Sequence, residues 1–315
     1  MVAEAAAFAK ARRMSRAAPS SVTVPLAVAT AGIAAFSSMD VLMKGLSISL
    51  GAYNAMLWRM MVGIVIGAVL FFASRTPWPQ RSTLRLHLLR GTIAAFMATT
   101  FFWGLARVPI AEAIALSFIA PLITLYLAAV LLGEKINRAA IMATLMGLAG
   151  VVVILSARLG GKYEPEVIKG IGSILVSAVL YAYNLVLQRK QAQLASPIEI
   201  AFFQNVTAGS VLLLAAPWWA FVPEVSHVPA IVAATTLAII ALLLLSWAYA
   251  RAEAQVLVPV EYTAFVWAAI FGWYFYGEAV TVTTFVGTAL IVAGCIVAAR
   301  QKPAAQPEHV EPVAL

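Results

Sequence analysis

Long apolar segments follow one another almost without interruption from residue 22 to residue 300. Each is about 20 residues long, the length that an α-helix needs to cross the hydrocarbon core of a bilayer. The connections are too short to fold as domains of their own. The sequence therefore predicts an all-α integral membrane protein with ten transmembrane helices, at 22–43, 52–73, 87–106, 109–132, 138–157, 168–188, 198–221, 230–250, 253–276 and 281–300.

The composition supports a membrane protein and argues against other classes. Of the 315 residues, 63% are hydrophobic and only 11% are charged, against roughly 25% charged residues in soluble domains. The basic residues behind the net charge of +8 gather beside the apolar segments, where they orient membrane helices. We therefore expect the lipid bilayer, and not nucleic acid, as a partner. The single cysteine, Cys295, excludes a disulfide framework, and we expect no metal and no cofactor.

The distribution of Lys and Arg predicts the orientation. If the N-terminus is cytoplasmic, these residues are roughly three times as frequent on the inner side as on the outer side. The expected location is a bacterial inner membrane, with both termini in the cytoplasm. Residues 1–21 are predicted to be a basic cytoplasmic tail before a retained first helix, because the apolar segment after them is too long for a signal peptide. Residues 301–315 are predicted to be a disordered cytoplasmic tail.

A shift of 144 residues places one half of the sequence on the other without a gap. Its most distinctive matches are Trp103 on Trp247, Arg107 on Arg251 and Gly133-Glu134 on Gly277-Glu278. The halves, residues 22–157 and 168–300, hold five predicted spans each. An odd number of spans turns the second half upside down, so the sequence predicts two inverted five-helix repeats. Inverted repeats favour transport by alternating access, although channels are built this way too.

Several motifs resemble the drug/metabolite transporter superfamily and, within it, the EamA-type bacterial carriers. They are Arg90-Gly91, Pro121, Gly133-Glu134, Pro259, Glu261-Tyr262 and Gly277-Glu278. The likeness extends over about residues 22–300 and includes carriers proposed to take up S-adenosylmethionine and similar metabolites. It implies a monomeric or homodimeric carrier of a small molecule, with its pocket between the halves.

Glu261 is the most unusual residue within a predicted span. It lies about 12 Å along its helix, near the depth at which carriers place their sites. Such a carboxyl is a candidate for binding a cationic substrate group or a coupling proton, or for a structural hydrogen bond between helices. Its repeat mate Ser117 is expected to face it, and Tyr262 and Trp267 are candidates for aromatic walls, although both residue types are also common at membrane interfaces.

Asp40 and Arg59 form a second candidate site, at similar depth in the first two spans. They are expected either to pair structurally, to form a gate, or to clamp a substrate carboxylate. The amides Asn184, Gln204 and Asn205 are candidates for lining the cavity or for bonding between helices.

Other polar residues are expected to play local roles. Lys44 is predicted to extend its amine to the membrane interface, and His87 and Arg90 are predicted to be topology anchors. Glu278 is expected to shape the end of its span. Gly63 and Gly67 form a GxxxG pair, typical of close helix packing.

Taken together, these features predict a secondary transporter for a small organic metabolite. Candidates are an amino acid, or a nucleoside-like or cofactor-like solute such as S-adenosylmethionine or a flavin. A channel or a structural membrane scaffold is the alternative, but the sequence shows no ring of charges and no carbonyl filter. A membrane-embedded enzyme fits less well, because no metal-binding cluster or activated nucleophile is evident and the chain is not expected to be an enzyme.

Overall fold

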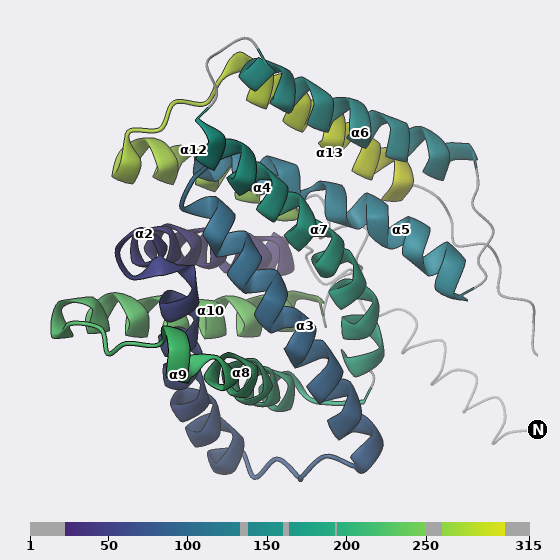
Figure 1. The fold of residues 1–315 in the computed structure, drawn as a ribbon. Helices are drawn as coiled ribbons and strands as arrows, with labels where there is room; N and C mark the ends of the chain where they lie inside the picture. The colour runs from purple at the N-terminus through teal and green to yellow at the C-terminus, as the bar shows by residue number, and fades with distance from the viewer. Residues whose placement is uncertain (1–22, 133–137, 160–163, 193, 250–259, 300–315) are drawn as a thin grey trace, which may run out of the picture.

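The computed structural model describes residues 23–132, 138–159, 164–192, 194–249 and 260–299 (Figure 1). Within these ranges the chain is helical or turns between helices, with no strand. The helices are α2 (Thr23–Ala73), α3 (Arg81–Leu105), α4 (Ile110–Ser117), α5 (Ile119–Leu132), α6 (Arg138–Leu159), α7 (Pro165–Ala192), α8 (Pro197–Leu214), α9 (Ala216–Trp219), the 3₁₀ helix η1 (Val225–His227), α10 (Val228–Tyr249), α12 (Thr263–Tyr276) and α13 (Val282–Ala299). The predicted tails and Pro259 lie outside the described residues.

The element α2 is two helices joined at Gly51. This residue has φ 74° and ψ 147°, a backbone conformation that only glycine adopts readily. The chain therefore turns at Gly51, and the two parts of α2 point in different directions (Figure 1). The first predicted span ended at residue 43, but the helix continues to the turn at Gly51. That prediction was too short, because hydropathy falls around Lys44 while the backbone hydrogen bonds continue.

Length and hydropathy identify membrane-crossing helices in much of the described chain. Five helical stretches are long and apolar enough to span a bilayer: Thr23–Ala73, Arg81–Leu105, Pro165–Gln188, Pro197–Leu214 and Val225–Ala248. Shorter apolar helices cover Ile110–Thr124, Leu145–Ser156, Thr263–Tyr276 and Val282–Gly294. The protein is thus an all-helical, multi-pass membrane protein.

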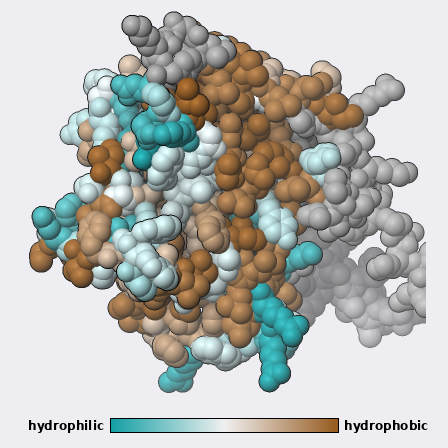
Figure 2. Space-filling model, in the orientation of Figure 1, coloured by the Kyte–Doolittle hydropathy of each residue, from teal (hydrophilic) through white to brown (hydrophobic). Residues whose placement is uncertain are grey.

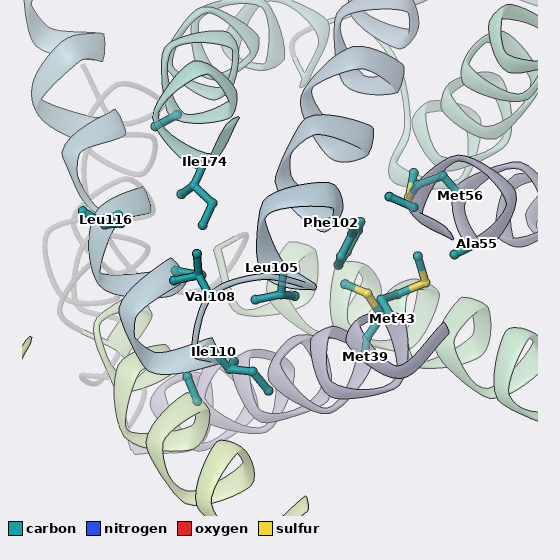
Figure 3. Close-up of a cluster of buried hydrophobic side chains, with 14 of the residues drawn as sticks. Met39, Met43, Ala55, Met56, Phe102, Leu105, Val108, Ile110, Leu116 and Ile174 are labelled. Atoms are coloured by element: carbon teal, nitrogen blue, oxygen red, sulfur yellow. The ribbon is translucent and has the colours of Figure 1, made fainter. Parts of the chain in front are cut away.

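The surface of the helices is suited to lipid. Leu214 is 75% exposed and Phe72 is 66% exposed, and Figure 2 shows a broad apolar area on the viewed face with hydrophilic groups at its margins. In water such a surface would be a liability, whereas lipid chains are an apolar solvent for it. Inside, Met39, Met43 and Met56 of α2 pack near Phe102 of α3 (Figure 3).

Helices that are far apart in sequence pack in pairs. The most extensive pairings are α2 with α10, α6 with α13, and α3 with α7. The approach of α6 to α13 is close, since a Cβ on Gly150 would lie 2.5 Å from the carbonyl oxygen of Gly287. The predicted GxxxG packing is confirmed, because Gly63 lies against Asn205 and Gly67 against Phe202 of α8.

Candidate functional site

Two helix interruptions define the candidate site. The first separates α4 from α5 at Phe118, directly after Ser117. Pro121 explains it, because a proline has no N–H for the carbonyl of the residue four positions earlier, which here is Ser117. The second lies at Tyr262, between a helical turn that includes Glu261 and the start of α12. The predicted fourth span is therefore broken near its middle.

The two interruptions meet each other. The rings of Phe118 and Tyr262 are in edge-to-face contact, with centroids 5.4 Å apart and an interplanar angle of 89°. Phe118 and Tyr262 are also 144 residues apart, so they are mates in the sequence repeat. Ser117 and Glu261 directly precede these two residues in the chain. The Ser117 hydroxyl donates a hydrogen bond to the Ala113 carbonyl at 2.9 Å.

Glu261 interacts electrostatically with Tyr181 of α7, and Tyr181 interacts in turn with Arg90 of α3. Tyr181 is 36% exposed. The half-buried carboxylate of Glu261 therefore lies near α7, on the side of Tyr181.

Asp40 and Arg59 attract each other across α2. Within the described residues, however, no salt bridge within 4.0 Å joins them. Arg59 Nη1 instead donates a hydrogen bond to the Met56 sulfur at 3.7 Å, and its buried Nε has no hydrogen-bond partner. An unpaired buried N–H costs about 1–3 kcal/mol. The Nε–H of Arg59 is therefore a donor that the described residues leave unused.

The structure distributes the other candidate residues over several environments. Trp267 packs against the Ala29 and Ile33 cluster of α2, with its ring 5.8 Å from that of Phe271. Asn205 lies where α8 packs against α2, in contact with Gly63. Its side-chain amide donates to the Ala201 carbonyl of its own helix. Gln204 is half-buried on the same helix. Asn184 is buried and accepts a hydrogen bond from Arg90 Nε at 3.1 Å.

An ion pair joins the buried Lys44 to the partly buried Glu278. The Lys44 amine also donates to the Val108 carbonyl at 2.8 Å, and the second Glu278 oxygen accepts from the Ile110 N–H at 2.7 Å. The prediction that Lys44 extends to the interface is therefore wrong, since this side chain is only 5% exposed. Sequence reasoning missed the pair because its members are 234 positions apart.

The shape of the α12 end explains the position of Glu278. Gly277 has φ 65°, its N–H donates to the Trp273 carbonyl, and the N–H of Glu278 donates to the Gly272 carbonyl. The bond from the Gly277 N–H to the carbonyl four residues earlier is that of the αL motif, which needs a left-handed residue after the helix and favours glycine there. The predicted span ending at Gly277-Glu278 is confirmed. The equivalent Gly133-Glu134 lies outside the described residues.

A second buried polar group forms between α3, α7 and α8. Arg90 and His87 of α3 are 5% and 1% exposed, so their prediction as surface anchors is wrong. The members of the group are connected in the order Asn184, Arg90, Gln191, His87 and Glu199. The sequence signal was available but ambiguous, because basic residues at the start of a span fit either role.

Comparison with known proteins places this architecture in a family. The model of the EamA-like transporter family matches residues 23–156 and 168–300. The pseudopaline exporter CntI of Pseudomonas aeruginosa (strain UCBPP-PA14) is 26% identical over 85% of this chain and 93% of the exporter. The S-adenosylmethionine uptake transporter of Rickettsia bellii is 24% identical over 81% of this chain and 86% of its own length.

A solved crystal structure is also similar, with a TM-score of 0.59 and 25% identity. The match covers 88% of this chain and 96% of the other chain. The two family matches together extend over most of the sequence and over both halves of the described fold. The protein is therefore a membrane transporter that belongs to the EamA-like transporter family.

Proposed function

We propose that the protein is a secondary transporter that moves a small zwitterionic metabolite across the bacterial inner membrane by alternating access. The observation that carries the proposal is the contact between the repeat mates Phe118 and Tyr262, each at a helix interruption. Contact between equivalent residues supports a position for them at a pseudo-twofold axis. Ser117 and Glu261 therefore flank the axis, and this is where a carrier with two rocking halves holds its substrate.

The proposal includes ten spans in two inverted repeats, residues 22–157 and 168–300. The pairs of packed helices support it. Under the shift of 144 residues the pairing of α3 with α7 becomes that of α10 with the first part of α2, and both are among the most extensive. The pairing of α5 with α7 becomes that of α12 with α2, which is also observed. Five spans in each repeat, with Lys and Arg concentrated on one side, give cytoplasmic termini.

The charges of the two candidate sites suggest the substrate class. Arg59, with an unpaired buried N–H, suits a carboxylate, whereas Glu261 and Asp40 suit a cationic group. The rings of Tyr262, Phe118 and Tyr181 provide faces on which a cation is favourable. S-adenosylmethionine, the named substrate of several relatives, has a carboxylate, an ammonium and a sulfonium group, so it is a suitable first test compound. A proton at Glu261 is a candidate coupling ion.

Alternating access needs contacts that close each end of the cavity in turn. The ion pair between Lys44 and Glu278 joins the first half to the second and, in the proposed orientation, lies at the outer end. The bonds from α3 to α7 join the halves at the inner end. In the proposed cycle the halves rock about Glu261 and Ser117, and the two sets of contacts separate alternately.

Ligand-dependent thermal stability tests the substrate site. Purified protein is heated with S-adenosylmethionine, amino acids, nucleosides and flavins in turn. A solute at 100 times its Kd stabilises the folded state by about 2.7 kcal/mol, and we expect a zwitterionic solute to do so. Glu261→Gln and Arg59→Gln should each abolish the shift. Glu224→Gln, which changes an exposed carboxylate outside the proposed site, is the matched control and should retain it.

Two results would contradict the assignment. If the shift persists in both Glu261→Gln and Arg59→Gln, the substrate does not bind at the axis. If neutral or purely anionic solutes stabilise the protein while zwitterions do not, the proposed substrate class is wrong even where the site is right.

A further inference from the structure

Five polar side chains form a continuous hydrogen-bonded chain inside the protein. Asn184 and Gln191 come from α7, His87 and Arg90 from α3, and Glu199 from the first turn of α8. All five are at most 6% exposed. Burying so many polar groups is costly unless every one of them is hydrogen-bonded, so the direction of each bond matters.

The directions follow from Arg90, whose guanidinium has donors only. It donates from Nε to Asn184 Oδ1 at 3.1 Å and from Nη1 to Gln191 Oε1. The Gln191 amide must therefore turn its NH₂ group toward His87, whose Nδ1 lies 2.6 Å away. His87 Nδ1 accepts this bond. The ring proton is then on Nε2, which donates to Glu199 Oε1 at 3.0 Å.

This arrangement is satisfied only while His87 is neutral. A second ring proton would place an N–H on Nδ1, opposite the NH₂ group of Gln191. Rotating the Gln191 amide would then turn its NH₂ group toward Arg90, so no orientation of Gln191 suits both neighbours. The bond between His87 and Glu199, by contrast, becomes charge-assisted and stronger. A proton therefore weakens the link from α3 to α7 and strengthens the link from α3 to α8.

The surroundings of His87 offer little other charge compensation. From α8 it faces the Glu199 carboxylate and the ring of Phe203, which stacks on it with centroids 4.8 Å apart. From α7 it faces the Gln191 amide, and Arg90 of its own helix is one hydrogen bond further away. Glu199 is thus the group that would balance an added proton.

The fold does not need such a chain in order to pack these helices. The repeat mates of His87, Arg90 and Glu199 are Ile231, Ala234 and Ala55, all buried in the apolar core. The equivalent seam between α2 and α10 is therefore closed at these positions by apolar side chains. The mates of Asn184 and Gln191 are the polar Asp40 and Ser47, so the two seams differ at the histidine, arginine and carboxylate positions, which indicates a role specific to one end.

The middle of the seam between α3 and α7 is joined by groups that do not titrate near neutral pH, and at its far end Arg107 Nε donates to the Glu166 carboxylate of α7 at 3.0 Å. Ser177 and Ser173 donate to the carbonyls of Met97 and Thr100, each at 2.7 Å, and Gly104 lies closely against Gly170. Neither hydroxyls nor backbone groups titrate near neutral pH. This part of the seam can therefore act as a hinge while the Gln191 end separates.

We infer that His87 and Glu199 form a proton-binding site that controls the seam between α3 and α7. A bound proton breaks the bond from His87 to Gln191 and opens the seam at its Gln191 end, while the Ser173 end stays closed. This inference deepens the proposed function, because in the proposed orientation the seam is the inner closure of the cavity. Opening of the cavity at its inner end then depends on a proton. This proton binds at His87 and Glu199 and not in the substrate site.

The test measures the distance across the seam at two pH values. Nitroxide labels are attached at Arg85→Cys on α3 and Lys190→Cys on α7, both exposed, in a Cys295→Ala background. We expect the distance in the unmodified seam to increase between about pH 8 and pH 5, the range in which histidines gain their charge. In Gln191→Glu the new carboxylate accepts from both Arg90 and protonated His87, so the distance should stay short at pH 5.

Gln188→Glu is the matched control, because Gln188 lies one turn away on α7 and is not one of the five hydrogen-bonded side chains. In this variant the distance between the labels should increase as it does in the unmodified protein. The inference is overturned if the unmodified distance does not change with pH, or if Gln191→Glu opens as well. His87→Gln, which cannot bind the proton, should not open, and opening of this variant would also overturn it. The measurement needs no substrate, so it remains interpretable if the thermal-shift screen finds no ligand and the proposed function fails.

Discussion

The buried charge of Lys44 is matched by its partners, and this matching explains why it is tolerated. Glu278 receives hydrogen bonds from the Lys44 amine and from the Ile110 N–H, while Lys44 also donates to the Val108 carbonyl. Removing two charges from water is costly, and a buried pair is stable only when its remaining hydrogen-bonding capacity is also used. Most of the stabilisation therefore depends on both partners being present.

This dependence gives a prediction for the Lys44 pair. Lys44→Met leaves the Glu278 carboxylate without its counter-charge, and breaking a buried pair in this way costs about 3–5 kcal/mol. The double change Lys44→Met with Glu278→Gln removes both charges and should cost clearly less than Lys44→Met alone. Unfolding of the purified protein by denaturant measures both values. Equal losses in the single and double variants would show that the two side chains are not coupled.

Individual residues were predictable where the repeat or a local rule applied to them. Glu261 was identified because a carboxylate in the middle of an apolar span is costly, and the repeat pointed from it to Ser117. Lys44 was misassigned because the snorkelling rule considers a lysine alone, whereas its partner is 234 positions away. His87 and Glu199 are 112 positions apart. Pairings over such distances depend on the tertiary arrangement, which a single sequence does not contain.

Among the elements, glycine and proline determine where helices turn or break. Hydropathy located the apolar segments but could not show that α2 is continuous up to Gly51, or that the fourth span breaks at Phe118. The first boundary depends on one residue with φ 74°. The second depends on Pro121, three residues after the break. The existence of the spans was predictable because it needs only composition, whereas their ends need backbone geometry.

Gly51 offers a test at the scale of the element. A residue with a Cβ is strained at φ 74° and ψ 147°, so Gly51→Ala should destabilise the protein by about 1–3 kcal/mol. The added methyl group meets no atom within 4 Å, so the loss would come from the backbone alone. Gly172→Ala is the matched control. It lies within the helix α7 with equally open space and should be neutral or stabilising, by up to about 1 kcal/mol.

If Gly51→Ala and Gly172→Ala change the melting temperature equally, the turn at Gly51 is not conformationally demanding. The joint between the first two helices would then not depend on glycine. A loss for Gly51→Ala alone would support α2 as two helices of fixed relative direction.

Across the whole molecule, the proposed symmetry relates each position in the first half to one on the opposite side of the membrane. Gln80 and Glu224 are such mates, 144 positions apart. Gln80 is the N-cap of α3 and Glu224 the N-cap of η1, directly before α10, and both are exposed. Their equivalent places at the start of equivalent helices make them a matched pair for testing the orientation of the halves.

Cysteine labelling in a Cys295→Ala background tests this relation. A membrane-impermeant maleimide should label Glu224→Cys in intact spheroplasts, because the predicted loop after the seventh span faces outward. Gln80→Cys should be labelled only in inside-out vesicles, since Arg75, Arg81 and Arg85 favour the cytoplasmic side. Labelling of both positions from the same side would mean that the halves are parallel, and two parallel halves could not exchange conformations across a central site. The reverse pattern would keep the inverted repeats and place the ion pair between Lys44 and Glu278 at the inner end.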